Sequence, residues 1–149
     1  MPNRAADWFA QAERDMEQAR ASQRDGRHEW ACFAAQQAAE KAVKALHLSC
    51  GQEAWGHVIA RLLEELPQRS PPDLSEKATV LDNFYVSTRY ANGHPEGPPF
   101  AHYSSIQSNQ AIQYADTAWL IRSWRRTCRP ACGSGGGLLG ESRPSRRCR

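Results

Sequence analysis

Arginine, tyrosine, asparagine and histidine gather in one segment of the sequence, which glycines and prolines keep from forming a helix. The segment reads TRYANGHPEGPPFAHY over residues 88–103, and its side chains of interest are Arg89, Tyr90, Asn92, His94, His102 and Tyr103. Arginine keeps its charge and presents a fork that matches phosphate, while tyrosine stacks on bases and asparagine binds a phosphate or a base edge. Five of these side chains, all except His94, predict a binding site for a nucleotide or for single-stranded RNA.

Arg89 and His94 together also fit a second chemistry, the metal-independent cleavage of RNA. This reaction needs a base for the ribose 2′-hydroxyl, an acid for the leaving oxygen and a cation near the charge that develops at phosphorus. Histidine exchanges a proton near neutral pH, so His94 would be the acid or base and Arg89 the stabilising cation. A catalytic pair formed by these two residues is therefore a second hypothesis.

A third hypothesis is that the segment only shapes the fold. A loop rich in glycine and proline leaves backbone carbonyls without partners, and the five donors of an arginine side chain can satisfy several of them. Arg89 would then stabilise the loop, and His94 would be an exposed turn residue. In that case the chain is a structural or protein-interaction bundle without a ligand.

Length and composition indicate one soluble domain. The chain has 149 residues, of which 40% are hydrophobic and 23% charged, and this suffices for a core. It contains no apolar run near the roughly 18 residues that a membrane span needs, and its first residues lack the apolar stretch of a secretory signal. We therefore expect a cytoplasmic protein that does not bind membranes.

The positive charge of the chain is concentrated at its end. The formal net charge is +3, but residues 127–149 hold five arginines and one acid, so the other 126 residues carry a net charge of −1. A protein that binds duplex DNA needs a basic face to displace counterions. The nearly neutral body therefore argues against duplex DNA as a partner.

The cysteines predict neither a metal nor a cofactor. Their number, five, is odd, and without a secretory signal this fits reduced thiols. Cys128 and Cys132 are four residues apart, but no second close pair completes a zinc site. We expect no metal and no cofactor.

Apolar residues recur with the helical period over most of the chain. They predict helices at about residues 5–23, 28–50, 57–66, 73–85 and 104–126, and no segment is typical of a strand. The expected fold is all-α, an antiparallel bundle of four to five helices with a long loop before the last helix. We expect this bundle to span residues 1–127 and a disordered tail, rich in Gly and Arg, to span residues 128–149.

Several side chains outside the loop have predicted places. Trp8 and Phe9 lie on an apolar stripe and are expected in the core. Glu40 and Lys44 have the spacing of an ion pair along one helix, and Lys44 is expected on its solvated side. His57 follows a glycine at a helix start, where it would pack against a neighbouring helix.

The order of these features resembles the HEPN domain, a family named for higher eukaryotes and prokaryotes and for nucleotide binding. The resemblance covers about residues 5–126, and the last of its motifs indicates the TRY-motif branch. Its motifs are AERDMEQAR, then EWACFAAQQAAEKAVKAL, then GH before VIARLLEEL, then LDNFYVSTRY.

The resemblance implies a small helical bundle that commonly forms homodimers. Many members are metal-independent endoribonucleases, often toxins encoded beside a minimal nucleotidyltransferase, and their hallmark is an Arg followed by four to six residues and a His. Arg89 and His94, with four residues between them, have this form. Other members keep the bundle but serve as binding or partner domains.

Tyr90 favours binding over cleavage, because catalytic members of the family usually have a small polar residue directly after the arginine. We therefore expect a nucleotide- or RNA-binding module that is the partner of a minimal nucleotidyltransferase in a toxin–antitoxin pair. The alternative is an endoribonuclease toxin that uses Arg89 and His94 at a dimer cleft. Whether the chain is an enzyme stays open at this point.

Overall fold

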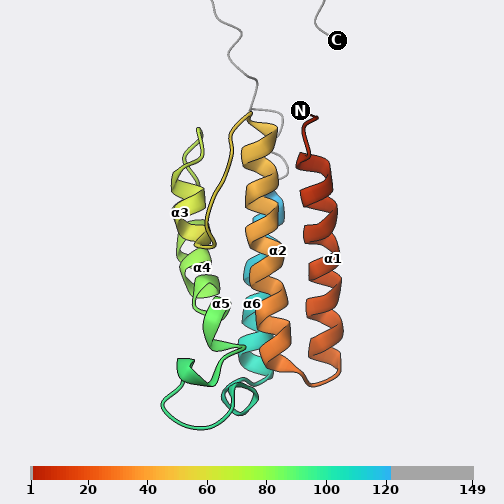
Figure 1. Ribbon diagram of the computed structural model, residues 1–149, viewed down its shortest axis with the longest axis vertical. Coiled ribbons are helices and arrows are strands. Elements are labelled where there is room, and N and C mark those ends of the chain that lie inside the picture. Colours follow the sequence, from red (N-terminus) through yellow and green to blue (C-terminus); the bar gives the residue numbers. More distant parts are fainter. Residues whose placement is uncertain (1, 122–149) are drawn as a thin grey trace, which may run out of the picture.

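The computed structural model describes residues 2–121, which form helices and loops without a strand (Figure 1). The predicted all-α bundle, with its long loop before the last helix, is confirmed. The helices are α1 (Ala5–Arg24), α2 (His28–Ser49), α3 (Ile59–Glu64), α4 (Pro72–Asp82), α5 (Phe84–Ser87) and α6 (Ser105–Ala118). Two short 3₁₀ turns, η1 (Ala91–Gly93) and η2 (Pro99–His102), lie in the loop before α6. The predicted tail and its boundary at residue 127 lie outside the described residues.

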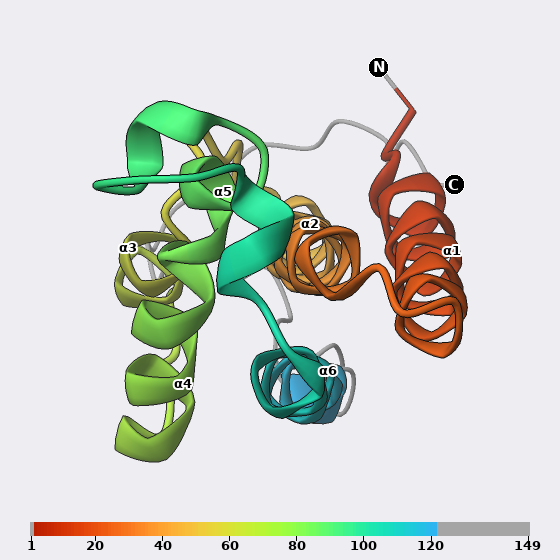
Figure 2. The ribbon, with the colours of Figure 1, turned by 90° about the horizontal axis from the view of Figure 1, so that it is seen from below.

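Helix α2 is the centre of the bundle and touches each of the other five α-helices. Figure 2, which looks along its axis, shows α1 on one side of it, α6 on another and the α3–α5 segment on a third. Alanine is the best helix former, and its small side chain lets neighbouring helices approach closely. The alanines of α2 that are fully buried are Ala31, Ala35, Ala38, Ala39 and Ala45.

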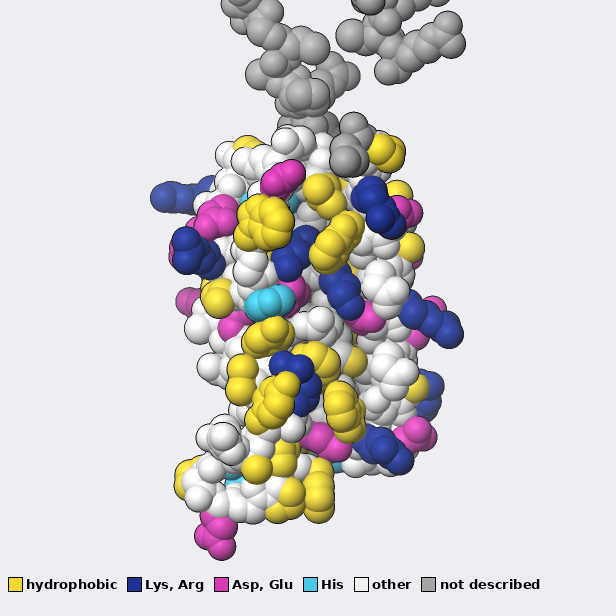
Figure 3. Space-filling view, viewed as in Figure 1, with side chains coloured by type: hydrophobic (Ala, Val, Ile, Leu, Met, Phe, Trp, Pro, Cys, Tyr) yellow, Lys and Arg dark blue, Asp and Glu magenta, His cyan; other side chains and the backbone are white. Residues whose placement is uncertain are grey.

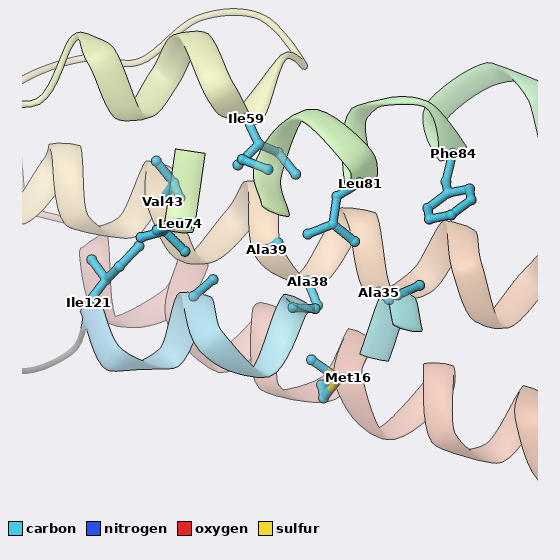
Figure 4. Packing of buried hydrophobic residues seen from close by; sticks show 14 of the residues in the cluster. Met16, Ala35, Ala38, Ala39, Val43, Ile59, Leu74, Leu81, Phe84 and Ile121 are labelled. Carbon is cyan, nitrogen blue, oxygen red and sulfur yellow. The ribbon is translucent and has the colours of Figure 1, made fainter. Parts of the chain in front are cut away.

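Larger side chains from the surrounding helices pack with Ala35, Ala38 and Ala39 in one core cluster (Figure 4). Ile59 and Leu81 come from α3 and α4, and Met16 comes from α1 on the opposite side. Each is at most 2% exposed. Burying an aliphatic side chain of this size stabilises a fold by about 1.5–3 kcal/mol relative to leaving it exposed. The core therefore fixes α2 between α1 on one side and α3 and α4 on the other.

A half-buried carboxylate fixes the start of the short helix α3. The Asp82 carboxylate, at the end of α4, accepts hydrogen bonds from the backbone N–H groups of Ile59 (2.7 Å) and Ala60 (3.1 Å). Burial raises the pKa of Asp82; the two hydrogen bonds oppose this rise, and the nearby charge of Glu40 adds to it. Asp82 therefore satisfies two N–H groups of α3 that its own residues leave without a partner.

The predicted helix over residues 73–85 is interrupted. Helix α4 ends at Asp82 and α5 begins at Phe84, with Asn83 as a turn between them. At the other end of the loop, Ser104 and Gln107 form a capping box that begins α6. The predicted end of this last helix, at residue 126, lies outside the described residues.

Three expectations about single side chains are wrong. Trp8 is 37% exposed, although its neighbour Phe9 is buried as expected. Lys44 is buried rather than solvated. Cys50 forms a disulfide bond, whereas Cys32 is a free thiol whose pKa burial raises to about 12.

Within residues 2–121, none of the helices has the length and apolar character to cross a membrane.

Candidate functional site

Arg89 lies just beyond α5, after Thr88, and its guanidinium group is held from several sides. Its Nε and Nη2 both donate hydrogen bonds to the backbone carbonyl of Tyr85, at 3.1 and 2.6 Å. Its Cζ lies 4.2 Å from the ring centroid of Phe33, 5.1 Å from that of Tyr85 and 5.0 Å from that of Tyr90. We call Phe33, Tyr85, Arg89 and Tyr90 the Arg89 cluster.

The Arg89 cluster leaves part of the guanidinium unused. No carboxylate of residues 2–121 forms an ion pair with Arg89, and the Tyr85 carbonyl takes only two of its five N–H donors. Aromatic faces attract the cation, but they do not neutralise it. The cluster therefore presents an oriented positive charge with N–H groups still free to bind an anion.

His94 lies in a different environment, against Ser87, the last residue of α5. Its Nε2 donates to the backbone carbonyl of Ser87 at 2.6 Å, because a carbonyl oxygen can only accept. The ring stacks on His102, with 4.0 Å between centroids and 2° between planes, and meets the edge of Tyr103 at 5.8 Å. His102 in turn donates from Nε2 to the Glu96 carbonyl at 2.5 Å. His94 thus attaches the loop to α5, and His102 joins two parts of the loop to each other.

Ser87 and Gly93 complete this second group. Ser87 Oγ donates to the Asn83 carbonyl at 2.6 Å and accepts the Tyr103 hydroxyl at 2.6 Å. Burial raises the pKa of Tyr103 above its usual value. A Cβ atom on Gly93 would lie only 2.8 Å from Ser87 Cα, so only glycine fits there without a shift. We call Ser87, Gly93, His94, His102 and Tyr103 the His94 cluster.

The site residues predicted from the sequence thus fall into two groups. Arg89 and Tyr90 are in contact, and so are the other aromatic candidates, His94, His102 and Tyr103. Within residues 2–121, none of the hydrogen bonds, ion pairs or ring contacts joins Arg89 to His94. Asn92 is exposed in η1.

Other residues of the Arg89 region were not singled out by the sequence. Phe33 comes from α2 and Tyr85 from α5, and both lie against the Arg89 guanidinium. Tyr85 also stacks on His57, with 4.6 Å between centroids and 15° between planes. Their helical spacing indicated only apolar packing. Their roles in the cluster depend on how α5 docks on α2.

His57 connects the Arg89 cluster to a buried ion pair. Its Nδ1 lies 3.1 Å from Glu40 Oε1, and the same oxygen accepts a hydrogen bond from Lys44 Nζ at 2.8 Å. The side chain of Glu40 is 4% exposed and that of His57 is 54% exposed. The expected packing of His57 against a neighbouring helix and the expected pair of Glu40 and Lys44 are both confirmed.

Aromatic and cationic side chains alternate on the face of the molecule that displays α2. Figure 3 shows hydrophobic side chains interspersed with Lys, Arg and His over this face, together with some Asp and Glu side chains. Two contacts pair a ring with a cation: Arg89 lies over Phe33, which also meets Trp30, and at the other end Lys44 Nζ lies 5.6 Å from the ring of Trp8. Such a mixture is typical of surfaces that bind single-stranded nucleic acid.

Comparison with known proteins agrees with this fold. The family model described as "HEPN domain" matches residues 5–123, and the chain belongs to that family. No curated protein matches it. The prediction of the family is confirmed, while the TRY-motif branch stays a prediction.

Three solved structures are similar over most of their length. A Thermus thermophilus protein has 45% sequence identity and a TM-score of 0.80, over 83% of this chain and 99% of that one. An archaeal HEPN homologue has 38% identity and a TM-score of 0.69, over 85% of this chain and 98% of that one. A HEPN domain protein from Thermotoga maritima has 33% identity and a TM-score of 0.60, over 82% of this chain and 93% of that one.

Proposed function

We propose that this HEPN domain is a nucleotide- or RNA-binding module in which Arg89 is the anion contact. The observation that carries the proposal is the state of the guanidinium: the Tyr85 carbonyl and three rings orient it, yet no described carboxylate neutralises it. An arginine that is already oriented loses little entropy when it binds phosphate. Its free N–H groups suit a phosphate oxygen.

Tyr90 supports a ligand with accessible bases. It packs on Arg89, but 54% of its surface is exposed, so one region of the surface offers both a cation and an aromatic ring. Single-stranded RNA and free nucleotides leave their bases free to stack on such rings, whereas a duplex does not. The ligand class we favour is therefore single-stranded RNA or a nucleotide.

Binding is favoured over cleavage by the hydrogen bond of His94. Its Nε2 donates to the Ser87 carbonyl and its ring is stacked on His102, so only Nδ1 is left for proton transfer. The endoribonuclease hypothesis, based on the spacing of Arg89 and His94, requires this ring to face a scissile phosphate. A homodimer and a minimal nucleotidyltransferase partner remain part of the proposal, supported by membership of the HEPN family.

The test is a titration of fluorescein-labelled oligouridylate with the protein, followed by fluorescence anisotropy. Arg89→Ala is expected to weaken binding by about 10- to 100-fold, because a charge-assisted hydrogen bond is lost. Arg61→Ala is the matched control, since Arg61 is an exposed arginine on α3 that pairs with Glu65. Equal binding by the wild type and Arg89→Ala would contradict the proposal.

The same RNA distinguishes binding from cleavage. After incubation with the protein in EDTA, intact RNA supports a binding module. Cleavage that survives chelation and is lost in both Arg89→Ala and His94→Ala would instead establish the endoribonuclease hypothesis.

A further inference from the structure

A cavity of about 490 Å³ lies beside the Arg89 cluster, between the start of α1, the second half of α2 and the connection to α3. Its volume is within the usual range for small-molecule pockets. Side chains of two tryptophans, a lysine, a glutamate and a histidine line it together with apolar residues: Trp8, Lys44, Leu48, Glu53, Ala54, Trp55, Gly56 and His57.

The two tryptophans are unusual in their exposure. Trp55 is 81% exposed and Trp8 37% exposed, although an indole ring is large and mostly apolar. Neither ring belongs to the core clusters of buried residues. Two indoles at the edge of one cavity offer faces on which a planar ring can stack.

The charges of the cavity favour a neutral ring over a phosphate group. Lys44, its only lysine or arginine, is already bound to the buried Glu40 carboxylate at 2.8 Å. Glu53 adds a negative charge and forms no ion pair within residues 2–121. A phosphate would therefore bind poorly here, whereas the neighbouring Arg89 cluster has a cation without a counter-ion among residues 2–121.

His57 places the cavity next to the Arg89 cluster. It lines the cavity, and its ring stacks on Tyr85 at 4.6 Å between centroids. The ring of Tyr85 lies 5.1 Å from the guanidinium carbon of Arg89. The His57 ring and that carbon are therefore separated by at most roughly 10 Å, about three nucleotides at the ~3.4 Å spacing of a stacked strand.

We propose that the cavity between Trp8 and Trp55 is a base-stacking subsite, and that the ligand of the Arg89 cluster is single-stranded RNA of two or more nucleotides. This inference rests on the proposed function. Tyr90 stacks one base beside Arg89, and the tryptophans stack a second base beyond His57. A free mononucleotide has only one base, and it binds beside Arg89, where its phosphate meets the guanidinium group and its base stacks on Tyr90.

The experiment compares uridine monophosphate with a hexamer of uridine, using isothermal titration calorimetry on the full chain. Trp55→Ala is expected to weaken hexamer binding by about 5- to 100-fold, the usual effect of losing one stacked base. It should leave mononucleotide binding unchanged. Trp55→Phe keeps an aromatic ring and should retain most of the affinity for the hexamer. Ile106→Ala, at a residue that is 77% exposed on α6, is the control for removing an exposed apolar side chain.

The outcomes separate this inference from the proposed function. If Arg89→Ala weakens hexamer binding but Trp55→Ala does not, the stacking subsite is wrong and the proposed function stands. An equal loss for both ligands in Trp55→Ala would mean that the cavity takes the base of a mononucleotide, which overturns the inference. A dimer that dissociates in Trp55→Ala during sedimentation, with hexamer binding unchanged, would assign the cavity to a second copy of the chain. If the wild type binds neither ligand, both proposals fail.

Discussion

The Arg89 cluster and the His94 cluster lie at the same short helix, α5, but they differ in how far their polar groups are satisfied by hydrogen bonds. In the His94 cluster, His94 and the Tyr103 hydroxyl donate to Ser87, and Ser87 donates to Asn83. In the Arg89 cluster, a cation keeps unused donors and has no counter-ion among the described residues. Polar groups that satisfy one another stabilise a fold, whereas an unsatisfied but oriented charge is available to a ligand. This difference is the basis of our proposal that the Arg89 cluster binds a ligand while the His94 cluster stabilises the loop.

Among variants of the His94 cluster, Gly93→Ala should cause the largest loss of unfolding free energy. The added Cβ would lie 2.8 Å from the backbone Cα of Ser87, so the loop or α5 must move. Overpacking of this kind typically costs about 1–3 kcal/mol of unfolding free energy. Denaturant unfolding would measure the loss, with Asn92→Ala as an exposed control in the same turn. A Gly93→Ala protein as stable as the control would show that this contact does not tie the loop to α5.

Tyr103→Phe should have a smaller effect that depends on pH. At neutral pH the variant loses the hydrogen bond to Ser87, a cost of about 1 kcal/mol. Burial raises the folded-state pKa of Tyr103 above its ordinary value of 10.0, so the neutral hydroxyl is favoured in the folded state. The stability that it contributes is present below pH 10 and is lost as the pH rises through the folded-state pKa. The gap between wild type and Tyr103→Phe should therefore narrow in alkaline solution.

Unfolding curves of the two proteins at neutral and alkaline pH would measure this gap, and their RNA affinities at neutral pH should be equal. A constant gap would mean that Tyr103 titrates alike in the folded and unfolded states. A loss of RNA affinity in Tyr103→Phe would break the separation between the two clusters.

The sequence predicts the bundle well because its strongest signals are local. Alanines at helical spacing determine α2, and the Glu40–Lys44 pair follows directly from residues four apart on one helix. The spacing does not show that this ion pair is buried. Burial adds the free-energy cost of removing both charges from water. A buried pair must be matched by further partners, and His57, which is distant in sequence, supplies one of them.

The candidate site was predicted less completely because it is made of tertiary contacts. Arg89 and Tyr90 were identified by type, but Phe33 joins them only because α5 docks on α2. The spacing of Arg89 and His94 suggested one catalytic pair, whereas the turn at Gly93 directs His94 to Ser87. Trp8 likewise lines a cavity with Lys44 and Leu48 of α2 instead of entering the core, which an apolar stripe does not reveal.

The most direct test of the central claim is NMR spectroscopy of the side chains during titration with single-stranded oligouridylate. The Arg89 Nε–H signal is a suitable probe, because the guanidinium lies over the Phe33 ring and should have a distinct chemical shift. We predict that RNA shifts this signal while the imidazole signals of His94 and His102 stay in place. Movement of the His94 and His102 signals with Arg89 unchanged would contradict the claim that the Arg89 cluster is the binding site.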